Sequence, residues 1–374
     1  MKFIASTSAL LKQLQIINGV ISSKVVIPIL EYFLFEVDKD KLKITGTDLE
    51  VSMQGIVNVQ STESGKVAVP AKMIIDILKS LPDQPITFTI NEDNNSIELT
   101  SDNGKYKITG EIADDFPKFP VLEDATSITM PADILQNAIS KTLFAVGTDE
   151  LKPALTGLFV DFATDSATFV STDGNKLVKY LRKDIPVEEP ATFILPRKAL
   201  NVLRTSITSD GTAQIDVLFN KINALFRFKD TTIVCRLIDE RFPDYNSAIP
   251  TDLPNKLIIN RHDLIDSLKR TQIFANKTTY QVRFNILGNE LELTSQDLDY
   301  ANEAHERLTC DYNGDNLEIA FSARFLVEML SSMDNDEIML SLTAHNRPGT
   351  ITPATPDENE ELIMLLMPIV IKFN

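Results

Sequence analysis

Hydrophobic and polar positions follow one helical pattern at three places in the chain. Residues 192–207 read TFILPRKALNVLRTSI, where a short apolar run meets a proline and a basic pair before an apolar-periodic segment. The same design appears 126 residues earlier as VAVPAKMIIDILKSL and 126 residues later as IAFSARFLVEMLSSM. The i, i+3, i+7 spacing predicts a helix with one buried face. Pro196 suits the first helical position, where its missing N–H costs nothing.

Aligning the three copies predicts which helix face is buried and which is exposed. In the alignment, one position is basic in all three copies and three positions are apolar. At about 100° per residue, the basic position lies roughly 160° around the helix from the first apolar position, so it is expected to point away from the core. The chain is therefore predicted to be a tandem repeat of three domains. The apolar columns are Ile74/Leu200/Leu326, Ile77/Leu203/Met329 and Leu81/Ile207/Met333, and the basic column is Lys72/Lys198/Arg324.

Each third of the chain also opens with a second amphipathic segment. These segments begin at Ser8, Pro131 and Arg261, roughly 60 residues before the helices described above. The residues in between alternate apolar and polar over short runs separated by turn-forming residues, which is typical of antiparallel strands. The sequence therefore predicts an α+β fold of three tandem domains, each with two helices packed against antiparallel sheets.

Two connectors rich in proline and acidic residues divide the thirds, at 114–131 and 239–256. Both contain a Phe-Pro pair, Phe116-Pro117 and Phe242-Pro243, again 126 residues apart, so the connectors belong to the repeat. We expect domains at residues 1–122, 128–246 and 247–374.

Composition is that of an ordinary globular protein, with 43% hydrophobic and 24% charged residues. Only two cysteines are present, too few for a disulfide framework, which favours a reducing cytosol and a cytoplasmic location. The longest apolar run, residues 362–371, is too short to cross a bilayer. We expect it to form a buried strand, and we expect no membrane partner.

The formal net charge of −17 argues at first against a nucleic-acid partner. However, the six helix-like segments together carry a net positive charge, and the excess of acidic residues lies outside them. One interpretation is that acidic residues simply collect in loops. The other is an acidic exterior with a locally basic surface lined by helices. Counting charges leaves both open.

Catalytic and metal-binding motifs are absent from the sequence. There is no phosphate-binding GxxxxGK[ST] loop, no HExxH and no CxxC, and the three histidines lack metal-ligand spacing. Asp48, Asp173 and Asp297 recur once per repeat after a predicted strand, where aspartate commonly forms turns. A paired-carboxylate hydrolase is therefore disfavoured, and we expect neither an enzyme nor a cofactor.

Five segments resemble the bacterial sliding clamp family, the β subunits of DNA polymerase III. They are ITGTDLE (44–50), STDGNKL (171–177), LPRKAL (195–200), RLIDERFPDY (236–245) and the MPI of residues 367–369. The resemblance runs from Met1 to within a few residues of Asn374. It implies a head-to-tail homodimer whose six domains form a pseudo-sixfold ring around duplex DNA, with helices lining the hole.

The resemblance also implies sites and partners. DNA is held without reading its sequence, and a separate pocket takes short peptide motifs of the polymerase α subunit, the clamp loader, other polymerases and repair proteins. The implied DNA-binding residues are Lys24, Lys72, Lys152, Arg197 and Lys198. The implied peptide-binding residues are Leu155, Thr172, Gly174, Asn175, Lys176, Leu177, Pro243, Leu365, Met367, Pro368 and Ile369. The implied dimer interface places Lys105 and Tyr106 of one subunit against Ile273 and Phe274 of the other.

The leading hypothesis is thus a non-catalytic processivity factor that encircles DNA. An alternative is an acidic three-domain adaptor that binds peptides but never closes around DNA.

Overall fold

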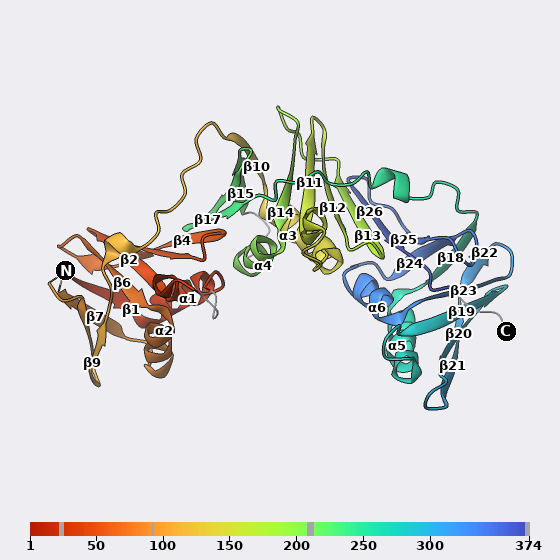
Figure 1. The fold of residues 1–374 in the computed structure, drawn as a ribbon, viewed down its shortest axis with the longest axis horizontal. Coiled ribbons are helices and arrows are strands. Elements are labelled where there is room, and N and C mark those ends of the chain that lie inside the picture. The colour runs from red at the N-terminus through yellow and green to blue at the C-terminus, as the bar shows by residue number, and fades with distance from the viewer. Residues whose placement is uncertain (22–25, 92, 208–212, 371–374) are drawn as a thin grey trace. The chain divides into compact units, whose positions relative to one another are not determined.

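A computed structural model describes residues 1–21, 26–91, 93–207 and 213–370 (Figure 1). Two helices lie in each third of the sequence, in agreement with the predicted fold class of helices and antiparallel sheets. The helices in these residues are α1 (Thr7–Ile17), α2 (Ala71–Ser80), α3 (Ala132–Thr142), α4 (Arg197–Ser206), α5 (Arg261–Thr271) and α6 (Ala323–Ser331).

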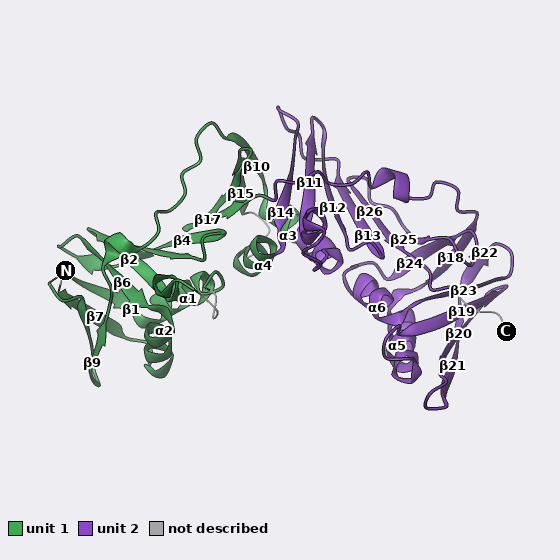
Figure 2. Cartoon of the chain, viewed as in Figure 1, with its two compact units in different colours: residues 1–136, 198–237 green, residues 137–197, 238–374 purple. Residues whose placement is uncertain are grey.

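The chain divides into two compact units, each with two sheets (Figure 2). Unit 1 comprises residues 1–136 and 198–237. Its first sheet has the order β5 (Gln60–Ser61), β1 (Lys2–Ser6), β7 (Pro85–Asn91), β8 (Ser96–Ser101), β9 (Gly104–Thr109). Its second has the order β10 (Thr126–Pro131), β15 (Gln214–Phe219), β16 (Asn223–Phe228), β17 (Thr231–Arg236), β4 (Val51–Asn58), β3 (Lys41–Thr47), β2 (Tyr32–Asp38), β6 (Gly65–Pro70).

Unit 2 comprises residues 137–197 and 238–374. Its larger sheet has the order β14 (Ala191–Pro196), β11 (Gly157–Ala163), β12 (Ser166–Thr172), β13 (Lys176–Arg182), β26 (Glu360–Leu366), β25 (Gly349–Pro353), β24 (Glu337–Leu342), β18 (Asn255–Asn260), β22 (Asp311–Asn313). Its smaller sheet has the order β21 (Asn302–Thr309), β20 (Glu290–Asp297), β19 (Gln281–Leu287), β23 (Leu317–Ser322).

Strands from different thirds of the sequence complete the two larger sheets. In unit 1, β17 pairs antiparallel with β4, and in unit 2, β13 pairs antiparallel with β26. The central third therefore contributes strands to both units. The domain boundaries at 122, 128 and 246 stay a prediction.

The repeated apolar stripe faces the core, with one local exception. Ile74, Leu200 and Leu326 are each at most 1% exposed, as the alignment of the three copies predicts. In the second column, Leu203 and Met329 are fully buried. In α2, however, Ile77 and Leu81 are only partly buried, because both line a surface cavity.

The position predicted for Pro196 is wrong by one residue. Pro196 ends β14, opposite Gly157, and α4 begins at Arg197. In the matching place before α2, Pro70 has φ −63° and ψ 116°, which is extended rather than helical. The fixed φ of proline fits the last residue of a strand as well as the first residue of a helix. The presence of proline therefore does not tell these two positions apart.

Each of the three recurring aspartates forms a turn, as the sequence predicts. Asp48 Oδ1 accepts hydrogen bonds from the amides of Glu50 and Val51, at 3.1 and 2.7 Å. Asp173 Oδ1 accepts from Asn175 and Lys176, at 2.8 and 3.0 Å.

Asp297 Oδ1 accepts a single bond, from the Asp299 amide at 3.2 Å. Side-chain capping of the following amides explains why one carboxylate recurs at the strand ends of every repeat.

The long apolar run near the C-terminus forms β26, which ends at Leu366, directly before Met367-Pro368. The prediction of a buried strand is confirmed for the first half of the run, because Leu362, Met364, Leu365 and Leu366 are all at most 4% exposed. It is wrong for the described residues after β26, where Met367 and Val370 are 45% and 74% exposed. No helix in the described part of the chain is long and apolar enough to cross a membrane.

The turn at Asp173 provides a test of local stability. Besides capping two amides, Asp173 pairs through Oδ2 with the buried ammonium of Lys176 at 2.8 Å. Asp173→Asn keeps a cap acceptor and removes the charge, whereas Asp173→Ala removes both. We expect Ala to destabilise the chain by at least about 1 kcal/mol more than Asn, because two amide donors lose their acceptor. Urea unfolding followed by circular dichroism measures the difference. Equal losses in the two variants would contradict the capping role.

Candidate functional site

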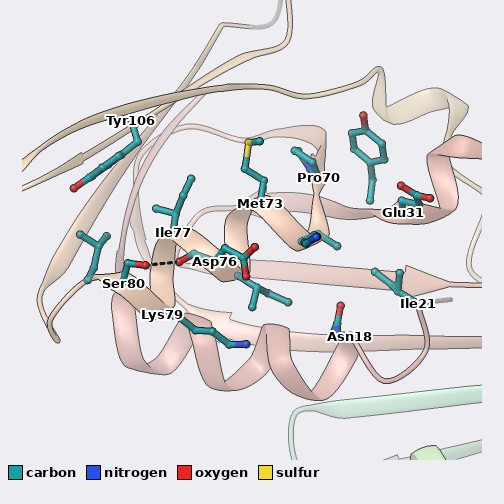
Figure 3. Close-up of a pocket in the computed structure, with 15 residues that line it drawn as sticks. Asn18, Ile21, Glu31, Pro70, Met73, Asp76, Ile77, Lys79, Ser80 and Tyr106 are labelled. Carbon is teal, nitrogen blue, oxygen red and sulfur yellow. Dashed lines mark hydrogen bonds between the residues drawn. The ribbon is translucent and has the colours of Figure 1, made fainter. Parts of the chain in front are cut away.

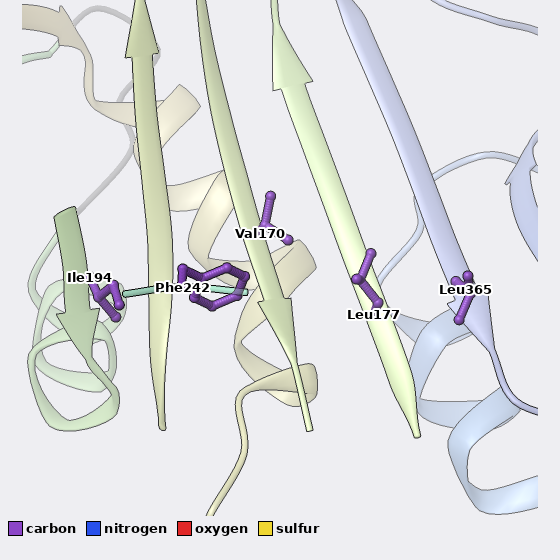
Figure 4. Packing of buried hydrophobic residues seen from close by; sticks show 5 residues of the cluster. All are labelled: Val170, Leu177, Ile194, Phe242 and Leu365. Carbon is purple, nitrogen blue, oxygen red and sulfur yellow. The ribbon is translucent and has the colours of Figure 1, made fainter. Parts of the chain in front are cut away.

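An apolar cluster in unit 2 spans four strands of the larger sheet and the segment that follows Arg241 (Figure 4). Alternation along antiparallel strands places its members on one face, since every second side chain points the same way. Phe159 of β11 lies opposite both Val170 of β12 and Ile194 of β14, and Leu177 of β13 lies opposite Leu365 of β26. The buried members are Val170, Leu177, Ile194, Phe242 and Leu365.

Partly exposed hydrophobic side chains cover this cluster and form an apolar surface. The rings of Phe159 and Phe242 stack with their centroids 4.8 Å apart, and Tyr245 lies 6.1 Å from the Phe159 ring. Leu155 reaches the cluster from the short helix η4 (Pro153–Thr156). Partly exposed large apolar side chains are typical of peptide-binding surfaces.

The sequence prediction and the observed cluster overlap in three residues. Leu155, Leu177 and Leu365 were expected at a peptide site and are brought together here. Sequence reasoning missed three of the buried members, Val170, Ile194 and Phe242. Val170 could have been inferred, because it lies two positions before Thr172 on β12 and alternate side chains of a strand share a face. Phe242 immediately precedes Pro243, which was predicted as a peptide-binding residue but is exposed.

The turn between β12 and β13 borders the cluster. Thr172 Oγ1 donates to the Lys176 carbonyl at 2.7 Å and accepts from the Gly174 amide at 3.0 Å. Gly174 has φ +92°, a conformation that favours glycine. Asn175 is exposed, so its side chain faces solvent at the edge of the apolar surface.

Lys176 differs from the other predicted rim residues because its ammonium is buried. Its side chain is 6% exposed, and Nζ lies 2.8 Å from Asp173, 3.7 Å from Glu328 and 4.1 Å from the centre of the Phe325 ring. A buried, paired cation anchors the turn against α6. It is therefore not a free charge at the surface.

The segment after β26 is held in place by main-chain hydrogen bonds. The Met367 amide donates to the Asn175 carbonyl at 2.9 Å, and the Ile369 amide donates to Ala320 of β23 at 2.8 Å. Pro368 between them has no N–H to donate. The hydrogen bond to Asn175 places Met367 beside the Thr172–Leu177 turn. Met367 is 45% exposed, so its side chain is available for contact with a ligand.

The predicted basic residues differ in their availability. Lys72 and Lys152 are exposed. Lys198 is engaged, because Nζ donates to the Val20 carbonyl at 2.8 Å and forms a salt bridge with Asp48. At this place in the repeat the ammonium therefore has partners within the chain, and its contact with DNA stays a prediction.

Arg197 is also engaged, since Nη1 donates to the Val146 carbonyl at 2.7 Å. In the same basic column, Arg324 pairs with Glu328 at 3.4 Å, one helical turn onward. Lys24 lies outside the described residues.

The residues predicted for a subunit interface are largely exposed. Ile273 and Phe274, in the short helix η6 (Gln272–Phe274), are 62% and 39% exposed, so they are not buried in the core of their own domain. Lys105 of β9 pairs with Glu98 at 3.1 Å.

Tyr106 lines a cavity of about 1150 Å³ that runs along α2 (Figure 3). Met73, Ile77 and Leu81 contribute apolar side chains to the same cavity. Unit 1 therefore carries a groove beside the edge strand β9 that is lined by both apolar and charged side chains.

No group of His, Cys, Asp and Glu side chains with the arrangement of a metal site occurs among the described residues.

Comparison with protein families covers nearly the whole chain in three consecutive matches. Residues 1–120 match the N-terminal domain of the DNA polymerase III beta subunit, residues 129–244 its central domain and residues 246–368 its C-terminal domain.

Curated relatives and solved structures agree with this assignment. The beta sliding clamp of Synechocystis sp. is 30% identical, covering 94% of this chain and 96% of the relative. That of Chlamydia pneumoniae is 28% identical, covering 94% and 95%. Among structures, the Pseudomonas aeruginosa sliding clamp bound to griselimycin is 26% identical with a TM-score of 0.94, covering 99% of this chain and 100% of that one. The Thermotoga maritima DNA polymerase III beta subunit is 27% identical with a TM-score of 0.91 and the same coverage. The chain therefore belongs to the beta sliding clamp family, the beta subunits of DNA polymerase III.

Proposed function

We propose that two copies of this chain close head to tail into a ring around duplex DNA and tether the replicative polymerase to it. Membership of a family of non-catalytic processivity factors over the full chain is the observation that carries this proposal. Persistence on DNA then comes from topology rather than from tight binding. This agrees with the net charge of −17, which opposes tight binding to a polyanion.

Contacts with DNA in this proposal are weak and independent of sequence. Lys72 and Lys152 carry exposed ammonium groups that can approach phosphates. Lys198 exchanges part of its interaction with Asp48 for a phosphate only when DNA is near. Labile contacts of this kind suit a ring that slides. The predicted contribution of Lys24 and Arg197 stays part of the proposal.

Partner proteins are proposed to bind at the apolar cluster around Leu177, Leu365 and Phe242. A short motif from the polymerase α subunit, the clamp loader or repair proteins would bury an aliphatic or aromatic side chain there. Exposed Met367 and the turn at Gly174 and Asn175 would border it. Complete burial of a leucine-sized group contributes about 1.5–3 kcal/mol.

The proposed subunit contact places Ile273 and Phe274 of one subunit in the groove beside α2 and β9 of the other. Ile273 and Phe274 are exposed in the single chain, and the groove offers them the apolar side chains of Met73, Ile77 and Leu81. Two such contacts satisfy both edges of a closed dimer.

Encirclement predicts that retention depends on the topology of the DNA. Loaded onto nicked circular DNA by the clamp loader with ATP, the chain should remain bound during gel filtration. It should be lost when a restriction enzyme linearises the circle, because the ring slides off the ends. Retention on linear DNA equal to that on the circle would contradict encirclement. Failure to load on either would favour the peptide-binding adaptor.

The subunit contact predicts that Ile273→Ala combined with Phe274→Ala yields a folded monomer. Both side chains are exposed, so their truncation removes the contact between subunits without opening a cavity in the core. Light scattering measures the mass, and circular dichroism checks the fold. Ile222→Ala is a matched control, since Ile222 is 60% exposed elsewhere on the chain. A dimer that survives the double substitution would place the interface elsewhere.

The peptide site predicts that truncation after Leu366 weakens binding of a labelled polymerase-motif peptide by about tenfold to a hundredfold, since about 1.4 kcal/mol corresponds to one decade. The truncation removes Met367 and its hydrogen bond to Asn175. Truncation after Val370 is the control and should leave affinity unchanged. Fluorescence anisotropy gives the affinities, with light scattering to verify the dimer. Unchanged affinity after the first truncation would remove residues 367–370 from the site.

A further inference from the structure

A cleft of about 260 Å³ opens on unit 1 at the place in the repeat that corresponds to the apolar cluster of unit 2. The strand register establishes this correspondence. Leu34 of β2 lies opposite Thr45 of β3, as Phe159 of β11 lies opposite Val170 of β12, and each residue is 125 positions from its counterpart. Leu34 and Thr45 line the cleft.

The connector after each domain continues the correspondence. Phe116-Pro117 lines the cleft in unit 1, and its counterpart Phe242-Pro243 follows the same position in the repeat. Phe116 is 5% exposed and Phe242 is 8% exposed. Phe119 adds a second, partly exposed ring to the cleft, three residues after Phe116. Both places therefore combine a sheet face with an aromatic Phe-Pro segment.

The chemistry of the two places differs, because the cleft has a charged rim. Lys43 pairs with Glu36 at 2.9 Å, Lys66 forms a salt bridge with Asp114, and Lys118 is exposed. Thus three ammonium groups and two carboxylates line the cleft. A locally positive rim stands out on a chain whose net charge is −17.

We propose that this cleft is a second peptide-docking site, which takes an acidic segment carrying one aromatic side chain. The ring enters between Leu34, Phe116 and Phe119, where the volume suffices for a single large side chain. Carboxylates on either side of the ring reach the ammonium groups of Lys66 and Lys118. The proposal goes beyond the proposed function and does not depend on ring closure or on the apolar cluster.

The existing ion pairs do not close the cleft to such a ligand. The side chains of Lys43 and Glu36 are 43% and 33% exposed, and those of Lys66 and Asp114 are 52% and 76% exposed. Hydrogen bonding between Lys66 and Asp114 lowers the pKa of the acid and raises that of the base, so both remain charged at neutral pH. Exposed pairs contribute little stability, so an incoming carboxylate can join them or replace one partner.

The absence of tryptophan from the chain gives a direct assay. A hexapeptide of sequence SDDWDG supplies the only tryptophan, and its emission shifts to the blue when the ring leaves water. We expect a saturable shift with the parent chain. We also expect at least tenfold weaker binding to the variant carrying Lys66→Glu and Lys118→Glu, because charge-assisted contacts become repulsive.

Controls separate this site from other sources of binding. Lys2→Glu combined with Lys41→Glu makes the same charge change at exposed positions outside the cleft lining and should alter affinity less than twofold. The peptide SNNWNG keeps the ring, loses the carboxylates and should bind weakly. Truncation after Leu366 should have no effect, which distinguishes this site from the proposed motif site.

Three outcomes would overturn the proposal. The first is no emission shift with the parent chain, and the second is equal binding by the cleft variant and the parent. The third is competition by a short single-stranded oligonucleotide as effective as competition by unlabelled acidic peptide, which would make the cleft a phosphate-binding site.

Discussion

The antiparallel pairing of β13 with β26 is the interaction on which the candidate site depends. It joins the central and last thirds of the sequence through seven residue pairs, from Lys176 opposite Leu366 to Arg182 opposite Glu360. This register sets Leu177 opposite Leu365 within the apolar cluster. It also carries Met367 to the carbonyl of Asn175. A shift by one residue would turn Leu365 away from the cluster, because alternate side chains face opposite sides of a sheet.

The partly buried carboxylate of Glu360 fixes the far end of the same pairing. Glu360 accepts from Lys141 Nζ at 2.6 Å and from the Tyr180 hydroxyl at 2.9 Å. Burial first, and then the neighbouring Glu360 carboxylate, raise the pKa of Tyr180 well above its ordinary value, so the hydroxyl stays protonated and donates. Polar contacts that must be satisfied are more specific than apolar ones, so Glu360 disfavours slipped registers.

Local features of the fold could be predicted from the sequence, whereas long-range electrostatic contacts could not. The helical stripe, the turns at Asp48 and Asp173 and the buried strand at the start of the last apolar run all depend on residues close in sequence. The Lys198–Asp48 salt bridge joins residues 150 positions apart, and no periodic pattern encodes it. Burial of the Lys176 ammonium likewise requires Phe325 and Glu328 of α6 to be in place. The basic column was therefore identified correctly as a row of residues, but the pairing of its charges was not.

The central position of β26 in the nine-stranded sheet has a consequence for biosynthesis. Its neighbours β13 and β25 are translated earlier, yet neither can pair with β26 until residues 360–366 have left the ribosome. Until then β13 presents an open edge bearing apolar residues such as Leu177 and Val178, and open edges favour association with other chains. The eight-stranded sheet, by contrast, is complete once β17 has emerged. The nascent chain therefore has all strands of its first large sheet after residue 236 but those of its second only after residue 366, so misassembly is most easily initiated while the residues between β13 and β26 are being made.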